Sequence, residues 1–441
     1  MMQSNEYSKP VDARGRFPAG VRITRPGIAI AVFMTAITLS VSAGQGESTD
    51  GWEQRFADPL TLRAHWDDGL RLETVDRQFR FQFGGRLQYD GAFLTADDEV
   101  KESVGDLDDG TRFRRARLYF AGQMYDHIAF RTEYDFAGGQ PGFRDAWVGL
   151  QHLPVIGNVR VGRMLEPFAL EGTSPNNQFT FIERGLPTAF HPFRNSGVML
   201  YDHALDRRMT WAAGLFMHTD DFGDSDTNSQ YSATGRLTGL PWYENDGRRW
   251  WHVGLSASRR KPDNDQYRLS ARPETFVAPR FVDTGLFPAD RVNLLGAETI
   301  LTIGPASLQA EYIHASAALV ETDDFPESGD ADFSGYYVYA SYFLTGEHRA
   351  YNRNTGGLGR IRPHRPFSAE GRGPGAWEIA ARYSELDLNA GPIDGGQLRN
   401  VTLGLNWHLT PNTRMTWNYV RADLKDSGKA DIAQWRMFLD F

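Results

Sequence analysis

The chain of 441 residues contains no cysteine. Disulfide frameworks and thiolate metal sites are therefore excluded, while the cellular compartment stays open. The chain also lacks any long uncharged apolar stretch after Ala43, so no transmembrane helix is expected there. Only helices and closed barrels satisfy every backbone polar group in lipid, so the protein is either a soluble exported protein or a β-barrel.

Motifs of catalysis are also missing. The sequence has no nucleophile elbow, zincin helix, phosphate loop or dinucleotide fingerprint. His191, Pro192 and Ser196 lie close together, but nothing supplies a matching third residue. The formal net charge of −9 argues against a general nucleic-acid binder. We therefore expect no enzyme, no catalytic residue, no cofactor and no nucleic-acid partner.

Aromatic residues, by contrast, are plentiful. They make up 13% of a chain whose mean hydropathy is −0.48. A barrel explains this pairing, because half of each strand faces lipid and half faces water, with aromatic girdles at both interfaces. An aromatic-rich soluble β protein would have the same composition, so composition alone leaves both classes open.

The first 43 residues have the form of a signal peptide. Five basic residues precede a short apolar run from Ile28 to Val41, and small residues follow up to Ala43. A membrane anchor is the alternative, but the run is shorter than the roughly 20 residues of a span. We expect cleavage after Ala43. Residues 44–65 then form a short N-terminal periplasmic segment, too short for the plug of a receptor-like transporter, and residues 66–441 form the barrel.

Strict alternation of apolar and polar residues marks strands with one wet face. It is clearest over 401–409, where valine, leucine and tryptophan alternate with threonine, glycine, asparagine and histidine. The stretches 126–136, 377–384 and 414–419 follow the same pattern. About sixteen candidate strands fit before Phe441, a number within the porin range. The expected fold is thus all-β, a transmembrane antiparallel barrel.

The connections between these strands differ in length. A tight turn joins His408 to Arg414, whereas 264–290 and 346–375 are long, polar and rich in Gly, Pro and Arg. Short turns at one end and long loops at the other are typical of outer-membrane barrels, so we expect both long segments at the loop end. The last strand alternates and ends in Phe441, which resembles the signal that the barrel-assembly machinery recognises.

An arginine-rich strand predicts part of the pore lining. Alternation places Arg115 and Arg117 opposite an apolar face that must meet lipid, where a mid-membrane arginine costs about 2–4 kcal/mol. Both should therefore point into the lumen, as should Arg86 on an earlier strand. Arg114 has the parity of the lipid face, so we expect it near a strand end or a bulge.

These arginines have two possible roles. A guanidinium presents a planar donor fork that suits phosphate, sulfate or carboxylate, and a ring of such groups favours anions. The alternative is a scaffold in which the arginines pair with Glu133, Asp135 and Asp145 across the lumen. Both roles can hold for one residue.

Several stretches resemble the phosphate-selective porin O and P family. The resemblance covers most of residues 70–441 and rests on the order and spacing of its motifs. The matching segments are 79–88 (FRFQFGGRLQ), 113–117 (FRRAR), Leu170-Glu171 with Ile182-Glu183-Arg184, 334–337 (SGYY) with 341–347 (SYFLTGE), 375–378 (GAWE) and 402–407 (TLGLNW).

The resemblance implies a sixteen-stranded barrel, a homotrimer in outer-membrane lipid, and passage of small anions such as phosphate. It also implies that the loop of residues 166–190 folds into the pore as a constriction, and that an arginine ladder lies in the loop of residues 261–291. The candidate pore-lining and anion-binding residues are Arg86, Arg114, Arg115, Arg117, Asp145, Arg184, Arg268 and Arg272.

The sequence departs from the family at several of its charged positions. Gly172 replaces a lysine after the Leu-Glu pair, Pro175 and Asn176 replace two serines, and Asp332 replaces a lysine before the Ser-Gly-Tyr-Tyr stretch. The tyrosine after the paired arginines is Arg117. We expect an outer-membrane porin with anion preference, phosphate or a similar oxyanion being the solute. The alternative is a general or carbohydrate/carboxylate diffusion porin without phosphate selectivity.

An acidic run between Asp97 and Asp109 offers carboxylates of the kind that calcium prefers. It has no EF-hand spacing. We expect a solvated loop and no metal site.

Overall fold

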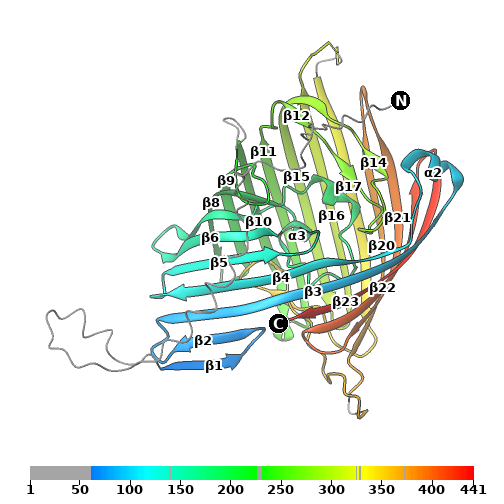
Figure 1. Cartoon of the computed structure of the whole chain (residues 1–441). Coiled ribbons are helices and arrows are strands. Elements are labelled where there is room, and N and C mark those ends of the chain that lie inside the picture. The colour runs from blue at the N-terminus through cyan, green and yellow to red at the C-terminus, as the bar shows by residue number, and fades with distance from the viewer. Residues whose placement is uncertain (1–60, 140, 226–230, 324, 327–328, 372) are drawn as a thin grey trace, which may run out of the picture. The chain divides into compact units, whose positions relative to one another are not determined.

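The structure, a computed structural model, describes residues 61–441 except 140, 226–230, 324, 327–328 and 372. The expected signal peptide and most of the expected segment 44–65 lie outside the described residues. Sixteen antiparallel strands form a closed ring, as predicted (Figure 1). They are β3 (Phe79–Ala96), β4 (Gly110–Met124), β5 (Ile128–Asp135), β6 (Gly142–Leu153), β7 (Gly157–Leu165), β8 (Arg194–Ala204), β9 (Met209–Met217), β10 (Tyr231–Glu244), β11 (Arg249–Arg260), β15 (Phe287–Ile303), β16 (Ala306–Leu319), β17 (Gly329–Phe343), β20 (Ala376–Ala390), β21 (Ile393–His408), β22 (Thr413–Leu424) and β23 (Gly428–Asp440).

The remaining elements are short. Two strands form a hairpin before the ring, and the others lie in connections between ring strands. They are β1 (Leu62–Trp66), β2 (Leu70–Thr74), α2 (Asp98–Val104), α3 (Leu170–Thr173), η3 (Leu186–Phe190), η4 (Asn245–Gly247), β12 (Gln266–Tyr267), β13 (Ser270–Ala271), β14 (Val282–Asp283), β18 (Tyr351–Asn352) and β19 (Gly357–Leu358). None of the described helices is long and apolar enough to cross a membrane.

The ring closes where the last strand meets the first. β23 pairs with β3 from Ala430↔Ala96 to Asp440↔Arg86. Beyond that register, β2 pairs with the remaining edge of β3, and the terminal Phe441 exchanges backbone hydrogen bonds with Gly85. The exposed edge of β3 is thereby covered along its length, which removes a template for edge-to-edge pairing.

The alternation in the sequence separates two faces of the wall. On β21, Val401 and Leu403 are about half exposed on the outside, whereas Thr402 and Asn406 are almost fully buried inside. An outward apolar face and an inward polar face are what a barrel in lipid requires. The strand prediction over 401–409 is thus confirmed.

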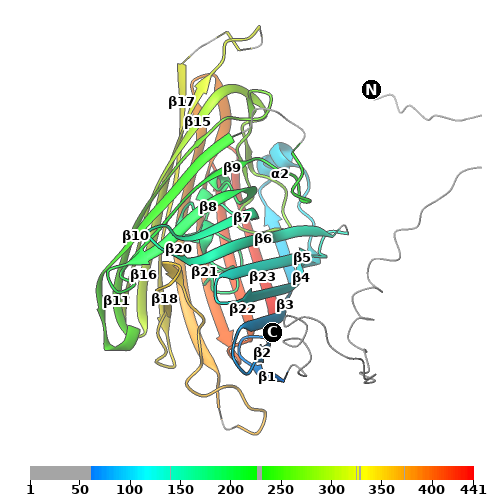
Figure 2. The same ribbon diagram turned by 90° about the vertical axis from the view of Figure 1, so that its left-hand side faces the viewer.

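One expected position is wrong. The connections alternate between the two ends of the barrel, and the segment 344–375 between β17 and β20 lies at the same end as the tight turns 205–208, 245–248 and 304–305. Figures 1 and 2 both show part of it extending below the barrel, opposite the long loops. The length of this segment suggested the loop end. Connections alternate between the two ends, however, so the number of strands that precede a connection decides its end.

Three segments fill much of the interior. We call residues 166–193 the lumen loop, residues 261–286 the outer loop and residues 344–375 the turn-side insertion. The lumen loop and the outer loop share an apolar cluster with the wall from β15 to β23, and the lumen loop and the insertion share a second cluster around Trp250. Inward side chains of β15–β22 are therefore mostly buried, whereas many on β4–β9 stay half-buried. The open part of the lumen lies along the first strands.

Candidate functional site

A polar cavity of about 460 Å³ lies inside the barrel on the side of the first strands. Strands β2–β8 and β23 contribute to it, together with the lumen loop and the turn-side insertion. Its charged lining consists of Asp68, Arg71, Arg86, Arg117, Arg131, Glu133, Asp145, Arg184, Arg194, Arg360 and Asp440.

Every carboxylate in this lining has an arginine partner. Glu133 pairs with Arg117 at 3.1 Å and also with Arg131, and Asp145 pairs with Arg194 at 2.9 Å. The remaining two acids, Asp68 and Asp440, both pair with Arg360, at 3.2 Å and 2.7 Å. The negative charge of the cavity is therefore compensated by arginines of the wall and of the turn-side insertion.

Two of the arginines have no carboxylate partner within ion-pair distance among the described residues. Arg86, on β3, donates from Nη1 to the side-chain oxygen of Asn176 in the lumen loop. Arg184 donates from Nε to the backbone oxygen of Glu171 at 2.7 Å and lies over the rings of Phe179 and Phe193. Burial lowers the pKa of Arg184 to about 10, so it remains charged at neutral pH. The uncompensated charge of the cavity is positive.

A second cluster surrounds Glu183 of the lumen loop. Its carboxylate lies 2.8 Å from Arg114 and 2.8 Å from Arg436. Burial would raise the pKa of Glu183, but these arginines and Arg115 hold it well below its usual range. Arg115 itself donates to Gln88 at 2.7 Å and has no ion-pair partner among the described residues.

Arg114 occupies a bulge, as its parity predicts. The β3–β4 register shifts between Gln88↔Arg115 and Tyr89↔Phe113, which leaves Arg114 without a Cα partner on β3. The extra residue turns its guanidinium inward to Glu183, although its parity belongs to the lipid face. It also lies over the ring of Phe276 in the outer loop, 4.0 Å from the centroid.

The eight predicted residues divide into three groups. Arg86, Arg117, Asp145 and Arg184 come together in the cavity. Arg114 and Arg115 lie around Glu183, and Arg272 shares the ring of Phe276 with Arg114 and Arg112. Arg268 lies apart from both groups, since it is exposed and pairs with Asp283 in its own loop. Arg117 also fits the scaffold alternative, because it pairs with Glu133 and with Asp135 at 2.8 Å.

Sequence reasoning missed several residues of the cavity. Arg131 has inward parity on β5 and could have been found by alternation. Arg194 begins β8 directly after the lumen loop, and Arg360 lies in the turn-side insertion. Their positions depend on connections between strands, for which the sequence carries no periodic signal.

The lumen loop is held across the barrel by charged side chains of the far wall. Glu311 on β16 accepts the backbone N–H of Leu170 at 2.6 Å and of Glu171 at 3.1 Å. Arg382 on β20 donates to the backbone oxygen of Glu183 at 3.1 Å and to the carboxylate of Glu274 in the outer loop. The inward fold that the resemblance implied is thus present, and Arg382 joins both loops to the wall.

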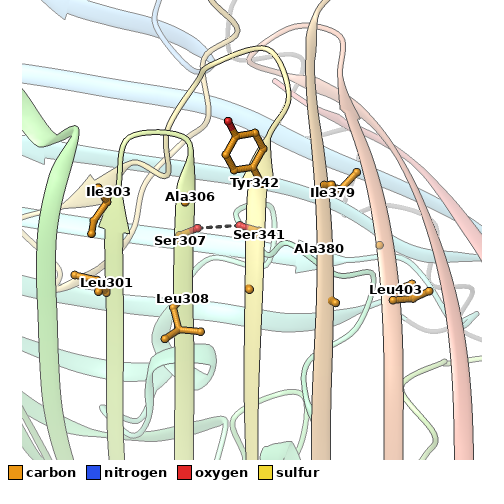
Figure 3. A pocket seen from close by; sticks show the side chains of 13 residues that line it. Leu301, Ile303, Ala306, Ser307, Leu308, Ser341, Tyr342, Ile379, Ala380 and Leu403 are labelled. Atoms are coloured by element: carbon orange, nitrogen blue, oxygen red, sulfur yellow. Dashed lines mark hydrogen bonds between the residues drawn. The ribbon is translucent and has the colours of Figure 1, made fainter.

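A separate groove of about 740 Å³ lies on the outside of the barrel (Figure 3). Leu301, Ile303, Leu308 and Leu403 line it, and one hydrogen bond of 2.8 Å joins Ser307 and Ser341 beneath it. No charged side chain of the described residues lines it. Its chemistry suits hydrocarbon, so we do not assign it a role in solute passage.

Two sequence features have simple places in the structure. Asp332, where the family has a lysine, is half-exposed on β17 and pairs with His314 at 3.2 Å on the outer face. Its charge is therefore outside the cavity. The acidic run includes α2, and across the described part of the chain no group of three or more His, Asp or Glu side chains is arranged to hold a metal ion.

Comparisons with known proteins agree with this fold. The family model described as phosphate-selective porin O and P matches residues 81–441. Porin O of Pseudomonas aeruginosa is 24% identical over 393 residues, which cover 80% of this chain and 85% of that protein. An anion-selective porin from Comamonas acidovorans has a TM-score of 0.50 at 16% identity, covering 82% of this chain and 100% of that one. OmpT of Vibrio cholerae, in a structure described as a trimer form, has a TM-score of 0.51 at 14% identity, covering 82% and 99%.

Proposed function

Because the chain belongs to the phosphate-selective porin O and P family, we propose that it is an outer-membrane porin through which small anions diffuse passively. Phosphate or a similar oxyanion is the preferred solute. The observation that carries the preference is the charge of the cavity: each of its carboxylates is paired, whereas Arg86 and Arg184 are not. A pore lined by uncompensated basic side chains favours anions.

The other predicted arginines contribute to the same preference. Arg268 and Arg272 of the outer loop attract anions, and Arg272 shares the ring of Phe276 with Arg114, which lies with Arg115 around Glu183. Arg117 and Asp145 chiefly shape the cavity, because both are held in ion pairs. The name of Porin O's family and that of the anion-selective porin from Comamonas acidovorans support the same preference.

The alternative is a general or carbohydrate/carboxylate diffusion porin without phosphate selectivity. Gly172, Pro175 and Asn176 favour it, because they supply none of the lysine and serine donors found in the family. The described residues that line the cavity include arginines but no lysine. Under this alternative, neutral oligosaccharides or carboxylates block the conductance and phosphate does not.

Reversal potentials in a KCl gradient across a planar bilayer test the proposal. We expect the wild-type protein to form channels that prefer chloride, and Arg86→Gln with Arg184→Gln to lower the chloride-to-potassium permeability ratio. Arg399→Gln is the matched control, because that side chain is exposed on the outer face of β21 and pairs with Glu385 at 3.2 Å. Absence of channels, or potassium preference in the wild type, would contradict the proposal.

Assembly and export complete the proposed function. The trimer form of OmpT from Vibrio cholerae supports a homotrimer here. We also propose export by the signal peptide of residues 1–43 to the outer membrane of a Gram-negative-type cell. Insertion by the barrel-assembly machinery through the terminal Phe441 follows, as the alternating last strand suggests.

A further inference from the structure

The cavity offers hydrogen-bond acceptors as well as cations. Asp145 pairs with two arginines, yet a carboxylate has about four lone-pair sites. The amide side chains of Asn176, Asn177 and Gln178 in the lumen loop line the same cavity as the phenol of Tyr119. An inorganic phosphate is chiefly an acceptor, so it would use the arginines, amide N–H groups and hydroxyls of this wall and leave most of the carboxylate and amide oxygens without a donor.

The hydrogen bonding of the wall is also incomplete. Arg86 Nε, Ser174 Oγ and Asn177 Oδ1 are buried and have no hydrogen-bond partner among the described residues. Ser174 is only 3% exposed, and Asn177 uses its amide nitrogen on Asp440 at 2.6 Å. An unsatisfied buried polar group is costly. All three residues line the cavity. A rotation of the Ser174 or Asn177 side chain would let its oxygen form a hydrogen bond with a solute there.

The size of the cavity points the same way. Its volume of about 460 Å³ falls within the range of roughly 300–1,000 Å³ that encloses small organic ligands. Inorganic phosphate is much smaller than this volume and could not fill it. A solute with an anionic head and a hydroxylated body could do so.

We infer that this cavity is a binding site for small hydroxylated organic anions, sugar acids or sugar phosphates. The oxyanion head lies between Arg86 and Arg184, and the hydroxyl groups exchange hydrogen bonds with Asp145, Tyr119 and the amides of the lumen loop. This inference rests on the proposed anion preference and narrows it to a substrate class. Hydroxyl groups donate to the paired carboxylates, so those carboxylates attract the body of the solute.

Block of the chloride current in planar bilayers tests the inference. Gluconate is compared with hexanoate, which has the same number of carbons and the same head but no hydroxyls, and glucose 6-phosphate is compared with inorganic phosphate. One or two added hydrogen bonds predict half-block at about threefold to tenfold lower concentration for at least one hydroxylated anion than for its counterpart. The pair that shows the difference identifies the head group.

Variants locate the effect. Tyr119→Phe with Ser174→Ala removes two hydroxyl groups of the lining, and we expect it to bring the concentration ratio toward one. Ser341→Ala is the matched control, because that hydroxyl lies in the wall outside the cavity and bonds Ser307. A ratio near one for both pairs in the wild type, or a ratio unchanged in the double variant, would overturn the inference. Potassium preference in the wild type would instead contradict the proposed function.

Discussion

Asp90 and Arg436 form a bidentate ion pair inside the barrel, at the seam where the first and last ring strands meet. Arg436 donates from Nε and from Nη2 to the two carboxylate oxygens of Asp90, each at 2.6 Å. The same guanidinium reaches Glu183 and the backbone oxygen of Ile182 in the lumen loop. One arginine therefore ties the closing seam to the loop that narrows the pore.

Breaking this seam pair should destabilise the barrel. Asp90→Asn removes one of the two carboxylate charges that compensate the buried Arg436, and breaking a buried pair costs about 3–5 kcal/mol. We expect the urea midpoint of unfolding, followed by tryptophan fluorescence in lipid vesicles, to fall accordingly. Arg421→Gln is the control, because its pair with Asp431 is exposed on the outer face and such pairs contribute about 0–1 kcal/mol. Equal midpoints for the two variants would contradict the assignment.

Arg382 should hold both lumen segments in place. Arg382→Met leaves the carboxylate of Glu274 buried without its cation, although Ser384 and Thr402 still donate to it. We expect a loss of about 3–5 kcal/mol and larger fluctuations of single-channel current. Because a well-packed apolar pair can replace a buried ion pair, Glu274→Met in the same chain should restore most of the stability. A double variant as unstable as the sum of the single variants would refute this coupling.

The hairpin of the turn-side insertion should limit conductance. The backbone N–H of Gly359 donates to the oxygen of Ala350 at 2.8 Å, so residues 351–358 can be replaced by an Asn-Gly turn. The replacement removes Leu358, which is 2% exposed and packs inside the barrel, and should cost about 2–5 kcal/mol. We expect single-channel conductance to rise. Deletion of the exposed residues 369–371 in the same insertion is the control and should leave conductance unchanged.

His191 should make the lumen loop sensitive to acid. Burial and the neighbouring Arg184 lower the pKa of His191 to about 3. Since the unfolded chain binds this proton near pH 6.5 and the folded chain does not, stability falls as pH decreases from about 6.5 toward 3. The free energy of unfolding of the wild type should therefore be lower at pH 4 than at pH 7 by roughly 3 kcal/mol because of this residue, and His191→Gln should abolish that part of the decrease. Urea midpoints of unfolding at pH 7 and pH 4 measure the decrease in each protein. An equal decrease in the wild type and in His191→Gln would disprove the role of His191.

The arginine strand shows how far local pattern reaches. Parity along 113–120 placed Arg115 and Arg117 inward and Arg114 near a strand end or a bulge. The structure buries the first two inside the barrel, and the register has a bulge at Arg114. These results follow from the sequence because side chains on a strand alternate strictly, so lipid on one face determines the other.

What the sequence by itself determined is therefore the wall: the strands, their two faces and their approximate number. Only the tertiary structure decided which arginines have no carboxylate partner. Arg117 reaches Glu133 from a neighbouring strand, and Arg360 reaches Asp440 from an insertion 80 residues away in the chain. The tertiary structure also placed residues 344–375 at the turn end. Alternation is a property of neighbouring residues, whereas charge compensation in the cavity depends on segments that meet only once the ring has closed.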